Sequence, residues 1–468
     1  MLRMTRKLAW ILRFMALGAI SAVGVFVLNN LFAYEVSWVK FRGAAPQQLP
    51  SIKPGSSVVI VAPHPDDEAL AVGGWLTKAA ADGAKVHAIL VTNGDNFTLE
   101  TRQVTRSFKA NAADYIENGK LRQEESIRAS RSLNYATVDF LGFPDQGIWP
   151  IWEDHWVTAF RSPFTEVDRS PYRRSFRREA PYEGQVLVDE LVELFAKYQP
   201  DFLIIPLRME THPDHYGASL FSTVAGLDPR IGKKPAVFEY IVHRGGYPYP
   251  YGFHPYAFLP PPDGLLNVGL DWRSFSLDSL ARGNKARALL QYRSQMFFAG
   301  YDLAGFYRRN EVASKGGNVF RVSQVPSTMV ENGGIRNVEF LEGGARDPVG
   351  DTAARILEPP GDVKMIRVAE SRSGAFAVAT FNAGVSDAID YRIDVRAFAD
   401  GVLVNRIIYD LPRGGRRPGA NIKIAGNNIE AALPPGFVGG GVVTFVEVLT
   451  SSQIGAIDRS AAFFEGGP

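Results

Sequence analysis

The sequence predicts a mixed α/β protein whose Rossmann-like, mostly parallel sheet carries helices on both faces. Apolar runs alternate with segments of helical spacing between residues 58 and about 300, which is typical of a parallel sheet. An uncharged run precedes this region and predicts an N-terminal transmembrane helix. Short alternating runs between glycine-rich turns follow it and predict a β-sandwich-like C-terminal domain.

Composition narrows the class of protein before any motif is considered. The chain has 468 residues, of which 46% are hydrophobic, enough for two or three folded domains. Its 51 basic and 49 acidic residues leave a net charge of +2, so we expect no nucleic-acid partner. The absence of cysteine excludes disulfides, cysteine-ligated zinc and a thiol nucleophile.

The first 35 residues are predicted to form a membrane anchor. Residues 1–13 carry Arg3, Arg6, Lys7 and Arg13 without any acid, and residues 14–34 carry no charge. This run is about as long as the ~20 residues that cross a bilayer as a helix. The basic flank predicts a single-pass protein with a cytoplasmic N-terminus and its remaining chain on the outer, periplasmic or extracellular side. A cleaved signal peptide and a buried core helix are the alternatives.

Residues 36–55 are expected to be a linker, and residues 56–310 one α/β domain. Four apolar runs predict its strands, at 56–62, 86–91, 137–141 and 202–205. Helical segments are expected at 69–82, around 119–134, and from Val186 to Phe195. Residues 148–182 interrupt this alternation as an insertion rich in tryptophan and arginine, which indicates either a surface loop that packs its tryptophans or an anion-binding lid.

The remaining chain divides into a connecting segment, 311–345, and a β-rich domain, 346–468. Alternating runs such as 391–395 indicate short antiparallel strands. The last histidine is His254, so any histidine-based metal chemistry is expected in the α/β domain.

Two of the predicted strands end in similar polar motifs. Pro63-His-Pro-Asp-Asp-Glu68 follows the first strand, and Thr211-His-Pro-Asp-His215 follows the strand at 202–205. In open parallel sheets ligands bind beyond the carboxyl ends of the strands, so the two motifs are expected to meet. Three ligands drawn from imidazole and carboxylate hold one divalent ion and leave a coordination position open. The available donors are His64, Asp66, Asp67, His212, Asp214 and His215. A single such motif would more simply be a turn or helix cap, and it is the pair that predicts a metal site.

These motifs, in this order, resemble the PIG-L/LmbE family of metal-dependent de-N-acetylases. The segments Arg122-Gln-Glu-Glu125, Leu141-Gly-Phe-Pro-Asp145, Glu239-Tyr-Ile-Val-His-Arg-Gly245 and 285–295 are also similar to family segments. The resemblance covers about residues 56–300. It leaves out the anchor, the insertion and the C-terminal domain.

The resemblance implies a role for each matching residue. His64, Asp67 and His215 would ligate the metal, and Asp66 would be the general base that activates its water. His212 would stabilise the oxyanion or assist the departing amine. Asp145 is expected to orient His212 or contact substrate, and Arg122 to bind substrate, with a plain surface ion pair as its alternative. Zinc is the implied cofactor, although two imidazoles and one carboxylate also suit Fe²⁺.

The implied reaction is hydrolysis of the N-acetyl group from an N-acetylglucosamine-type sugar in a glycoconjugate or glycan. The alternatives are a metal-dependent amidase acting on a non-sugar amide and a carbohydrate-binding protein without turnover. The sequence leaves the particular glycan and the oligomeric state open.

Overall fold

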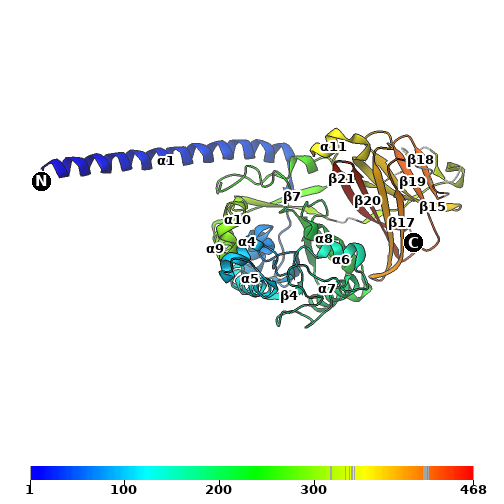
Figure 1. Ribbon diagram of the computed structural model, residues 1–468, viewed down its shortest axis with the longest axis horizontal. Helices are drawn as coiled ribbons and strands as arrows, with labels where there is room; N and C mark the ends of the chain where they lie inside the picture. Colours follow the sequence, from blue (N-terminus) through cyan, green and yellow to red (C-terminus); the bar gives the residue numbers. More distant parts are fainter. Residues whose placement is uncertain are drawn as a thin grey trace.

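The computed structural model describes residues 2–316, 319–331, 334–336, 338, 341, 343–350, 352–414, 419 and 421–466. Parts of the predicted 311–345 segment and the last two residues of the predicted C-terminal domain lie outside this set. A long N-terminal helix projects from an α/β domain, and a β-rich domain lies at the opposite end (Figure 1). This arrangement confirms the three parts of the predicted fold class in outline: one apolar helix, a mostly parallel sheet and a β-rich C-terminal region.

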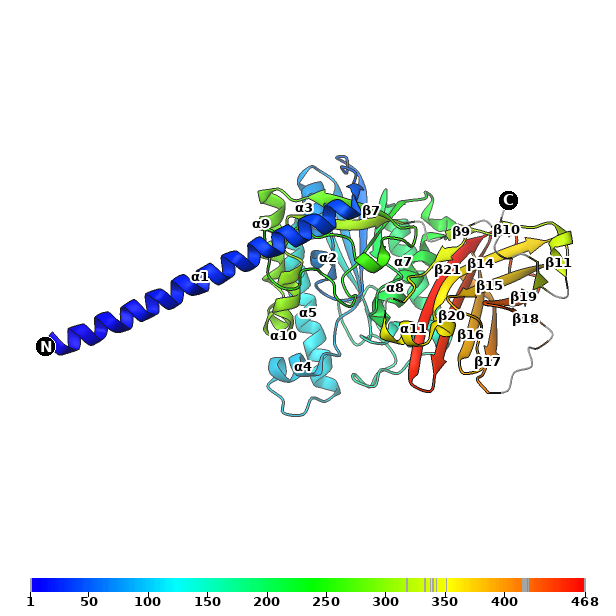
Figure 2. The same ribbon diagram turned by 90° about the horizontal axis from the view of Figure 1, so that it is seen from above.

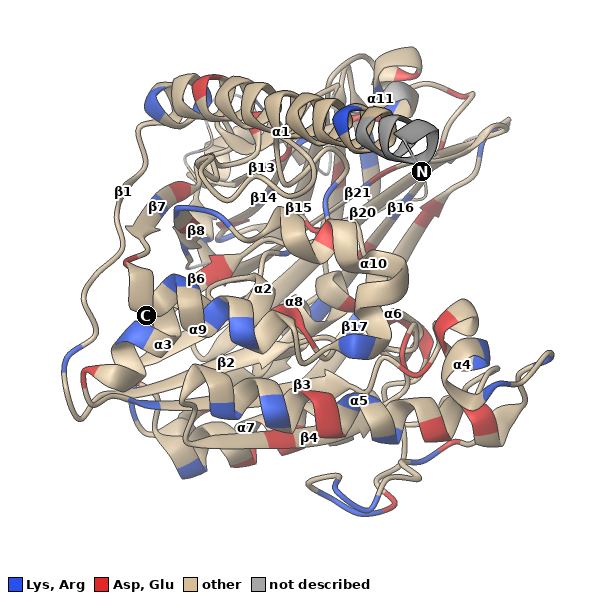
Figure 3. Ribbon diagram, turned by 90° about the vertical axis from the view of Figure 1, so that its left-hand side faces the viewer, with Lys and Arg blue, Asp and Glu red and all other residues tan. Residues whose placement is uncertain are grey.

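Helix α1 spans Leu2–Ala44 and therefore continues well into the predicted linker. Its part from Trp10 to Ala44 is long and apolar enough to cross a bilayer, and no residue of its most apolar stretch is buried. The middle of the helix carries no charged residue (Figure 3). These features are shared by membrane anchors and signal sequences.

The last turns of α1 pack on the α/β domain through one aromatic residue. The ring of Phe258 lies 5.9, 4.9 and 5.0 Å from the rings of Tyr34, Trp38 and Phe41. Its backbone N–H donates to the Ser37 hydroxyl at 3.0 Å. The C-terminal third of the helix is therefore attached to the domain, whereas the apolar part projects freely.

Five parallel strands form the centre of the α/β sheet. They are β2 Ser57–Ala62, β3 Lys85–Thr92, β4 Thr137–Phe143, β5 Phe202–Pro206 and β6 Ala236–Tyr240. Their spatial order is β4-β3-β2-β5-β6, so the chain changes direction across the sheet between β2 and β5. Ligands of such sheets bind outside the carboxyl ends of the strands at this switch point. One polar motif follows β2 and the other follows β5, and these two strands flank the switch point.

Three further strands extend the sheet beyond β6. They are β8 Asn310–Lys315, antiparallel to β6, then β7 Asp271–Ser276 and the short β1 Gln47–Gln48. The sheet therefore runs past residue 310, where the sequence placed the end of the domain. The sequence missed β8 because its residues, Asn-Glu-Val-Ala-Ser-Lys, show neither an apolar run nor a clear alternation.

Helices cover both faces of this sheet, as predicted. One face carries α2 Asp67–Leu70, α3 Gly73–Ala81, α5 Ala112–Leu133, α9 Ser279–Leu289 and α10 Arg293–Gly305, with α4 Thr98–Thr105 packed on α5. The other carries α6 Ile148–Asp154, α7 Gly184–Tyr198 and α8 Pro213–Gly226. Alternate residues of β2 enter the two cores, Val58 and Ile60 on one side and Val59 and Val61 on the other. The helix expected over 69–82 is broken between α2 and α3.

The C-terminal domain consists of two sheets around a shared core. The first joins β14 Val363–Ser371, β15 Gly374–Phe381, β18 Ile422–Ala425 and β19 Asn428–Leu433, with the short β10 Ser323–Gln324 and β13 Ala345–Arg346. The second joins β16 Asp390–Ala399, β17 Val402–Leu411, β20 Val442–Ser452 and β21 Gly455–Glu465, with β9 Val319–Arg321 at its edge. Helix α11, Ala353–Leu357, packs beside β21. A two-stranded ribbon, β11 Val330–Glu331 with β12 Gly334–Ile335, lies against β19. Because β9 and β10 belong to these sheets, the predicted connecting segment is partly integrated into the domain.

The two domains meet through α6 and α8, where β20 and β21 lie against the α/β domain (Figure 2). Trp152 is fully buried there, with its ring 5.0 Å from Phe221, 5.9 Å from Phe398 and 5.1 Å from Phe445. The Arg396 guanidinium donates to the Trp152 carbonyl at 2.5 Å. The tryptophans of the insertion thus serve packing, while its Arg174 and Arg177 form exposed ion pairs with Glu124 and Glu193.

Candidate metal centre

The turn after β2 brings His64, Asp66 and Asp67 to the edge of the sheet. Asp66 adopts φ 117°, a conformation that costs a non-glycine residue about 1–3 kcal/mol and persists only where surrounding contacts enforce it. Its carbonyl accepts from the N–H groups of Ala69 and Leu70, which begins α2. The Asp67 carboxylate accepts from the His64 N–H at 2.9 Å and closes the turn. Adjacent carboxylates are thereby directed to different sides.

Helix α8 supplies His212, Asp214 and His215 from the other side of the switch point. His212 is the N-cap residue, and its Nδ1 accepts from the Asp214 N–H at 3.2 Å. A neutral His212 therefore carries its hydrogen on Nε2. Pro213 at the first helical position suits the start of a helix, and His215 lies one turn in, fully buried.

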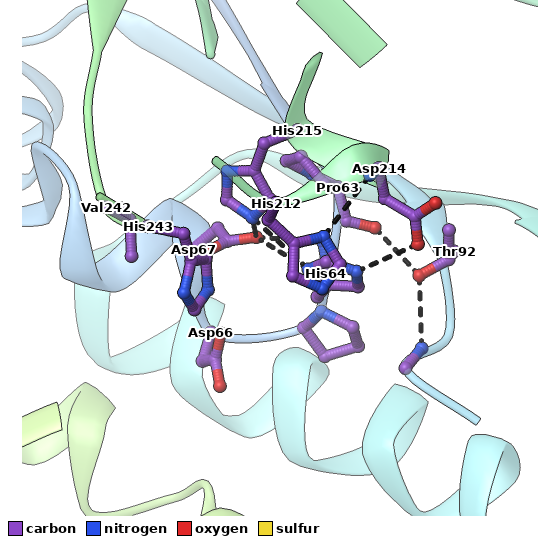
Figure 4. Close-up of polar contacts among 12 residues, drawn as sticks. Pro63, His64, Asp66, Asp67, Thr92, His212, Asp214, His215, Val242 and His243 are labelled. Atoms are coloured by element: carbon purple, nitrogen blue, oxygen red, sulfur yellow. Dashed lines mark hydrogen bonds and ion pairs between the residues drawn. The ribbon is translucent and has the colours of Figure 1, made fainter. Parts of the chain in front are cut away.

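Three donor atoms from these segments converge on one point (Figure 4). His215 Nε2 lies 3.1 Å from Asp67 Oδ2 and 3.3 Å from His64 Nδ1, and His64 Nδ1 lies 3.4 Å from Asp67 Oδ2. Ligands bound to one tetrahedral ion at ~2.1 Å would be roughly 3.4 Å apart. The separations therefore fit a shared divalent ion. The other Asp67 oxygen, Oδ1, is buried and has no hydrogen-bond partner among the described residues, which also favours a cation.

Carboxylates face the outer nitrogens of both histidines. His64 Nε2 lies 3.2 Å from Asp214 Oδ2 and 3.4 Å from Asp145 Oδ1, and His215 Nδ1 lies 3.4 Å from Glu210 Oε1. Such partners fix ring orientation and make the inner nitrogen a better ligand. Burial lowers the pKa of His215, but the charges of Asp67 and Glu210 outweigh it and raise this pKa to about 9.

Asp66 stands beside this group rather than within it. Burial raises the pKa of its carboxyl well above the usual value, against the opposing charge of Arg122. Arg122 Nη2 lies 3.5 Å from Asp66 Oδ2 and donates to the Pro65 carbonyl at 2.7 Å, while Nη1 donates to the Gly94 carbonyl at 2.9 Å. A larger residue at position 94 would displace this guanidinium, because its Cβ would lie 1.9 Å from Arg122 Nη1. Arg122 thus holds the turn that carries Asp66, and it also lines a cavity next to that turn.

Asp145 pairs with His64, and its charge also acts on His212. Its carboxylate faces His64, and Oδ2 accepts from the Asn96 N–H at 3.2 Å. Among the contacts of the described residues, none joins it to His212 by a hydrogen bond. Asp145 also lines the cavity, so the structure leaves a substrate contact open to it.

Sequence reasoning assigned no role to His243, which joins the cluster from the loop after β6. Its Nε2 lies 4.0 Å from Asp67 Oδ1, and its ring is 4.6 Å from that of His215. With His64, Asp67 and His215 it forms a group of four potential ligands. The available signal was a histidine just after the mostly apolar residues 236–242. These residues include β6, whose carboxyl end reaches the same sheet edge as that of β5.

A cavity of about 540 Å³ opens over these residues. The polar residues in its lining include His64, Asp66, Arg122, Asp145, His212 and His243. Tyr247, Tyr251 and Phe306 add apolar surface to the lining. The site therefore has the size and mixed lining of a pocket for one small organic group.

Buried imidazoles and carboxylates at the switch point of this parallel sheet thus form a candidate site for a divalent metal ion. Residues 59–225 match the family model described as PIG-L, GlcNAc-PI de-N-acetylase. These residues therefore form a PIG-L domain, as the sequence motifs indicated.

Curated relatives and a solved structure are each similar to part of the chain. The 1D-myo-inositol 2-acetamido-2-deoxy-alpha-D-glucopyranoside deacetylase of Saccharomonospora viridis is 28% identical over 170 residues, which are 36% of this chain and 57% of that protein. Diacetylchitobiose deacetylase of Thermococcus kodakarensis is 25% identical over 209 residues, 41% of this chain and 61% of that protein. The chain thus spans somewhat more than half the length of these relatives. The solved N,N'-diacetylchitobiose deacetylase of Pyrococcus horikoshii has 18% identity and a TM-score of 0.33, covering 56% of this chain and 79% of its own.

Proposed function

We propose that this chain hydrolyses the N-acetyl group of an N-acetylglucosamine-type sugar, with a divalent ion, zinc by preference, held by His64, Asp67 and His215. The observation that carries the proposal is the convergence of three donor atoms beside Asp66, next to a cavity that His64 and Asp66 line. The similarity to deacetylases of inositol-linked and chitobiose substrates supports the choice of reaction. Zinc suits this donor set, as does Fe²⁺.

A divalent ion at this position would polarise the acetyl carbonyl and acidify the attacking water. Asp66 would accept a proton from that water as it adds to the carbonyl carbon. When the C–N bond breaks, the amine takes up this proton and leaves as a free amino sugar, while acetate forms.

His212 is suited to hold the developing oxyanion. Its Nδ1 is occupied by the Asp214 N–H, so Nε2 carries the hydrogen that can be donated into the cavity. Burial and the neighbouring imidazoles His64 and His215 lower the pKa of His212, which keeps this ring neutral at ordinary pH. A neutral donor fixed in advance stabilises the transition state without reorganisation.

We also propose that α1 anchors the chain as a single transmembrane span, with the N-terminus in the cytoplasm and the catalytic domain on the outer side. The unburied apolar stretch and the basic residues that precede it support this topology. Protease added to sealed cells lacking an outer wall should digest the catalytic domain. Protection of that domain, or its recovery as a soluble protein with a cut near residue 34, would contradict the proposal.

The activity is tested with the full-length chain in detergent, loaded with zinc. Acetate should be released from N-acetylglucosaminides and not from N-acetylated amino acids, which are the matched non-sugar amides. Release from the amino acid conjugates alone would instead establish an amidase. Sugar binding without release of acetate would leave a carbohydrate-binding protein, and either result would overturn the proposed function.

A further inference from the structure

A second, larger cavity separates the two domains. Its volume is about 1230 Å³, more than twice that of the cavity over the histidines. One wall consists of the loops after β5 and β6, and the other is the end of the sheet formed by β16, β17, β20 and β21. Pockets for a single small molecule commonly measure ~300–1,000 Å³, so this cleft has room for a larger ligand.

The cleft is continuous with the candidate metal centre. Thr211, Arg244, Gly246 and Tyr247 line both cavities. Thr211 immediately precedes His212, and Arg244 immediately follows His243. The two segments are joined, because the Thr211 N–H and hydroxyl both donate to the His243 carbonyl, at 2.8 and 2.9 Å. A ligand whose reacting group lies at the histidines can therefore extend past this junction into the cleft.

Arg208 lines the cleft and has a hydrogen-bond donor without an acceptor among the described residues. Arg208 is only 5% exposed, and its Nη1 donates to the Ala461 carbonyl at 2.8 Å. Its Nε has no acceptor among the described residues, while the charges of Glu239 and Asp347 act on the guanidinium. Because Arg208 also lines the cleft, its guanidinium offers positive charge and N–H groups to a ligand that supplies acceptors.

The remaining lining mixes both charges with aromatic faces. Arg459 stacks 4.3 Å from the Tyr216 ring centre and 4.4 Å from that of Trp149. Arg392 and Asp410 lie 3.9 Å apart on neighbouring strands, with 36% and 65% of their side chains exposed. A ligand with many neutral hydroxyl groups can both donate to such carboxylates and accept from such guanidinium groups, whereas a strongly charged ligand would meet repulsion from one set.

We infer that this cleft binds the continuation of a linear glycan, so that the enzyme deacetylates residues within a polysaccharide or long oligosaccharide rather than a single small conjugate. The inference rests on the proposed function and names its substrate class. The sugar that reacts would occupy the cavity over the histidines, and the neighbouring sugars would lie across Thr211 and Arg244 toward Arg208.

The test compares N-acetylglucosamine oligomers of one to six units. For the full-length zinc-loaded chain we expect kcat/KM to rise about tenfold or more between the shortest and the five-unit substrate, because each additional subsite contributes binding energy. The double variant Arg392→Ala/Asp410→Ala and the cleft-filling Ala456→Trp should lose most of this rise while keeping the value for the shortest substrate. Arg372→Ala, on the exposed turn between β14 and β15, is the matched control and should behave as wild type.

Binding measured by calorimetry on the Asp66→Asn chain gives a readout that does not require turnover. The five-unit oligomer should bind about tenfold more tightly than the monomer, and Ala456→Trp should abolish the difference. Acetate release that does not depend on length, or cleft variants that lower all substrates equally, would overturn the inference and leave the proposed function standing. Length-dependent binding without acetate from any oligomer would support the cleft and refute the proposed function.

Discussion

Nδ1 of His64 and Nε2 of His215 lie 3.3 Å apart although 151 positions separate the two residues in the sequence. The proximity follows from topology, because β2 and β5 are neighbours in the sheet and their carboxyl ends meet at the switch point. Two imidazole nitrogens at this distance, with a carboxylate oxygen beside both, form a set of three donor atoms that suits a divalent cation.

Asp66→Asn should abolish turnover while leaving the shape of the site intact. The amide cannot accept the proton of the attacking water, so we expect kcat to fall by ~10²–10⁴. Acetate release under saturating substrate measures the effect. Activity within a few fold of wild type would remove Asp66 from the role of general base.

Glu210→Gln should weaken metal binding without removing a ligand. The Glu210 carboxylate faces His215 Nδ1 and accepts from the Val242 N–H at 2.6 Å, so its charge supports that imidazole as a ligand. We expect zinc affinity to fall by ~10–100-fold, measured by competition with a chelator. Glu190→Gln, the same change at a buried position on α7, is the control and should leave the affinity unchanged. Equal affinities in all three proteins would show that Glu210 does not tune the site.

Glu190→Gln should stabilise the protein at neutral and alkaline pH. Glu190 is fully buried, neither carboxylate oxygen has a hydrogen-bond partner among the described residues, and burial raises its pKa from 4.5 to about 8. Between pH 4.5 and 8 the unfolded chain ionises this group while the folded chain keeps it protonated, so wild type loses stability as the pH rises through this range. Glutamine avoids the penalty, and we expect a gain of about 1–3 kcal/mol at pH 8.

Urea unfolding of both proteins at pH 4.5 and pH 8 checks this prediction. The two curves should nearly coincide at pH 4.5 and separate at pH 8, with the variant unfolding at higher urea. A variant that is less stable at pH 8 would contradict the assigned protonation of Glu190.

Trp152→Ala should loosen the junction between the domains. The buried ring contacts aromatic residues from both sides of the junction, and removal of such a side chain costs about 3–5 kcal/mol. We expect limited proteolysis to separate the C-terminal domain much faster than in wild type, with oligomer hydrolysis reduced more than hydrolysis of the shortest substrate. Unchanged proteolysis would show that other contacts hold the domains together.

The sequence predicted the elements with strong hydrophobic patterns and missed the weakly patterned ones. The runs at 56–62 and 202–205 became β2 and β5 because fully buried parallel strands need continuous apolar residues. Strand β1 forms one edge of the sheet and β8 lies between β7 and β6, and pairing with neighbouring strands rather than an apolar sequence defines both. Helix α1 extends beyond its apolar segment because Trp38 and Phe41 pack on Phe258, a contact that local sequence does not reveal.

The residues of the candidate site likewise divide into those that a clear motif predicted and those that it did not. The motifs around His64 and His215 predicted metal-ligand donors at two strand ends, and the order of the strands in the sheet brings these donors together. His243 lies in the family-like segment 239–245, but that segment predicted no role for it, and its place beside Asp67 depends on β6 lying next to β5 in the sheet. Asp145 was expected to orient His212 or contact substrate, and the path of the loop after β4 brings its carboxylate within 3.4 Å of His64 Nε2.

Elemental analysis of the full-length chain and its single variants tests the central claim most directly. The account predicts one equivalent of zinc or iron per chain in wild type and in Asp66→Asn, and less than about a tenth of an equivalent in Asp67→Ala and His215→Ala, since removing one of three protein ligands destroys the site. A full equivalent of metal in Asp67→Ala and His215→Ala, or none in wild type after incubation with zinc, would contradict it.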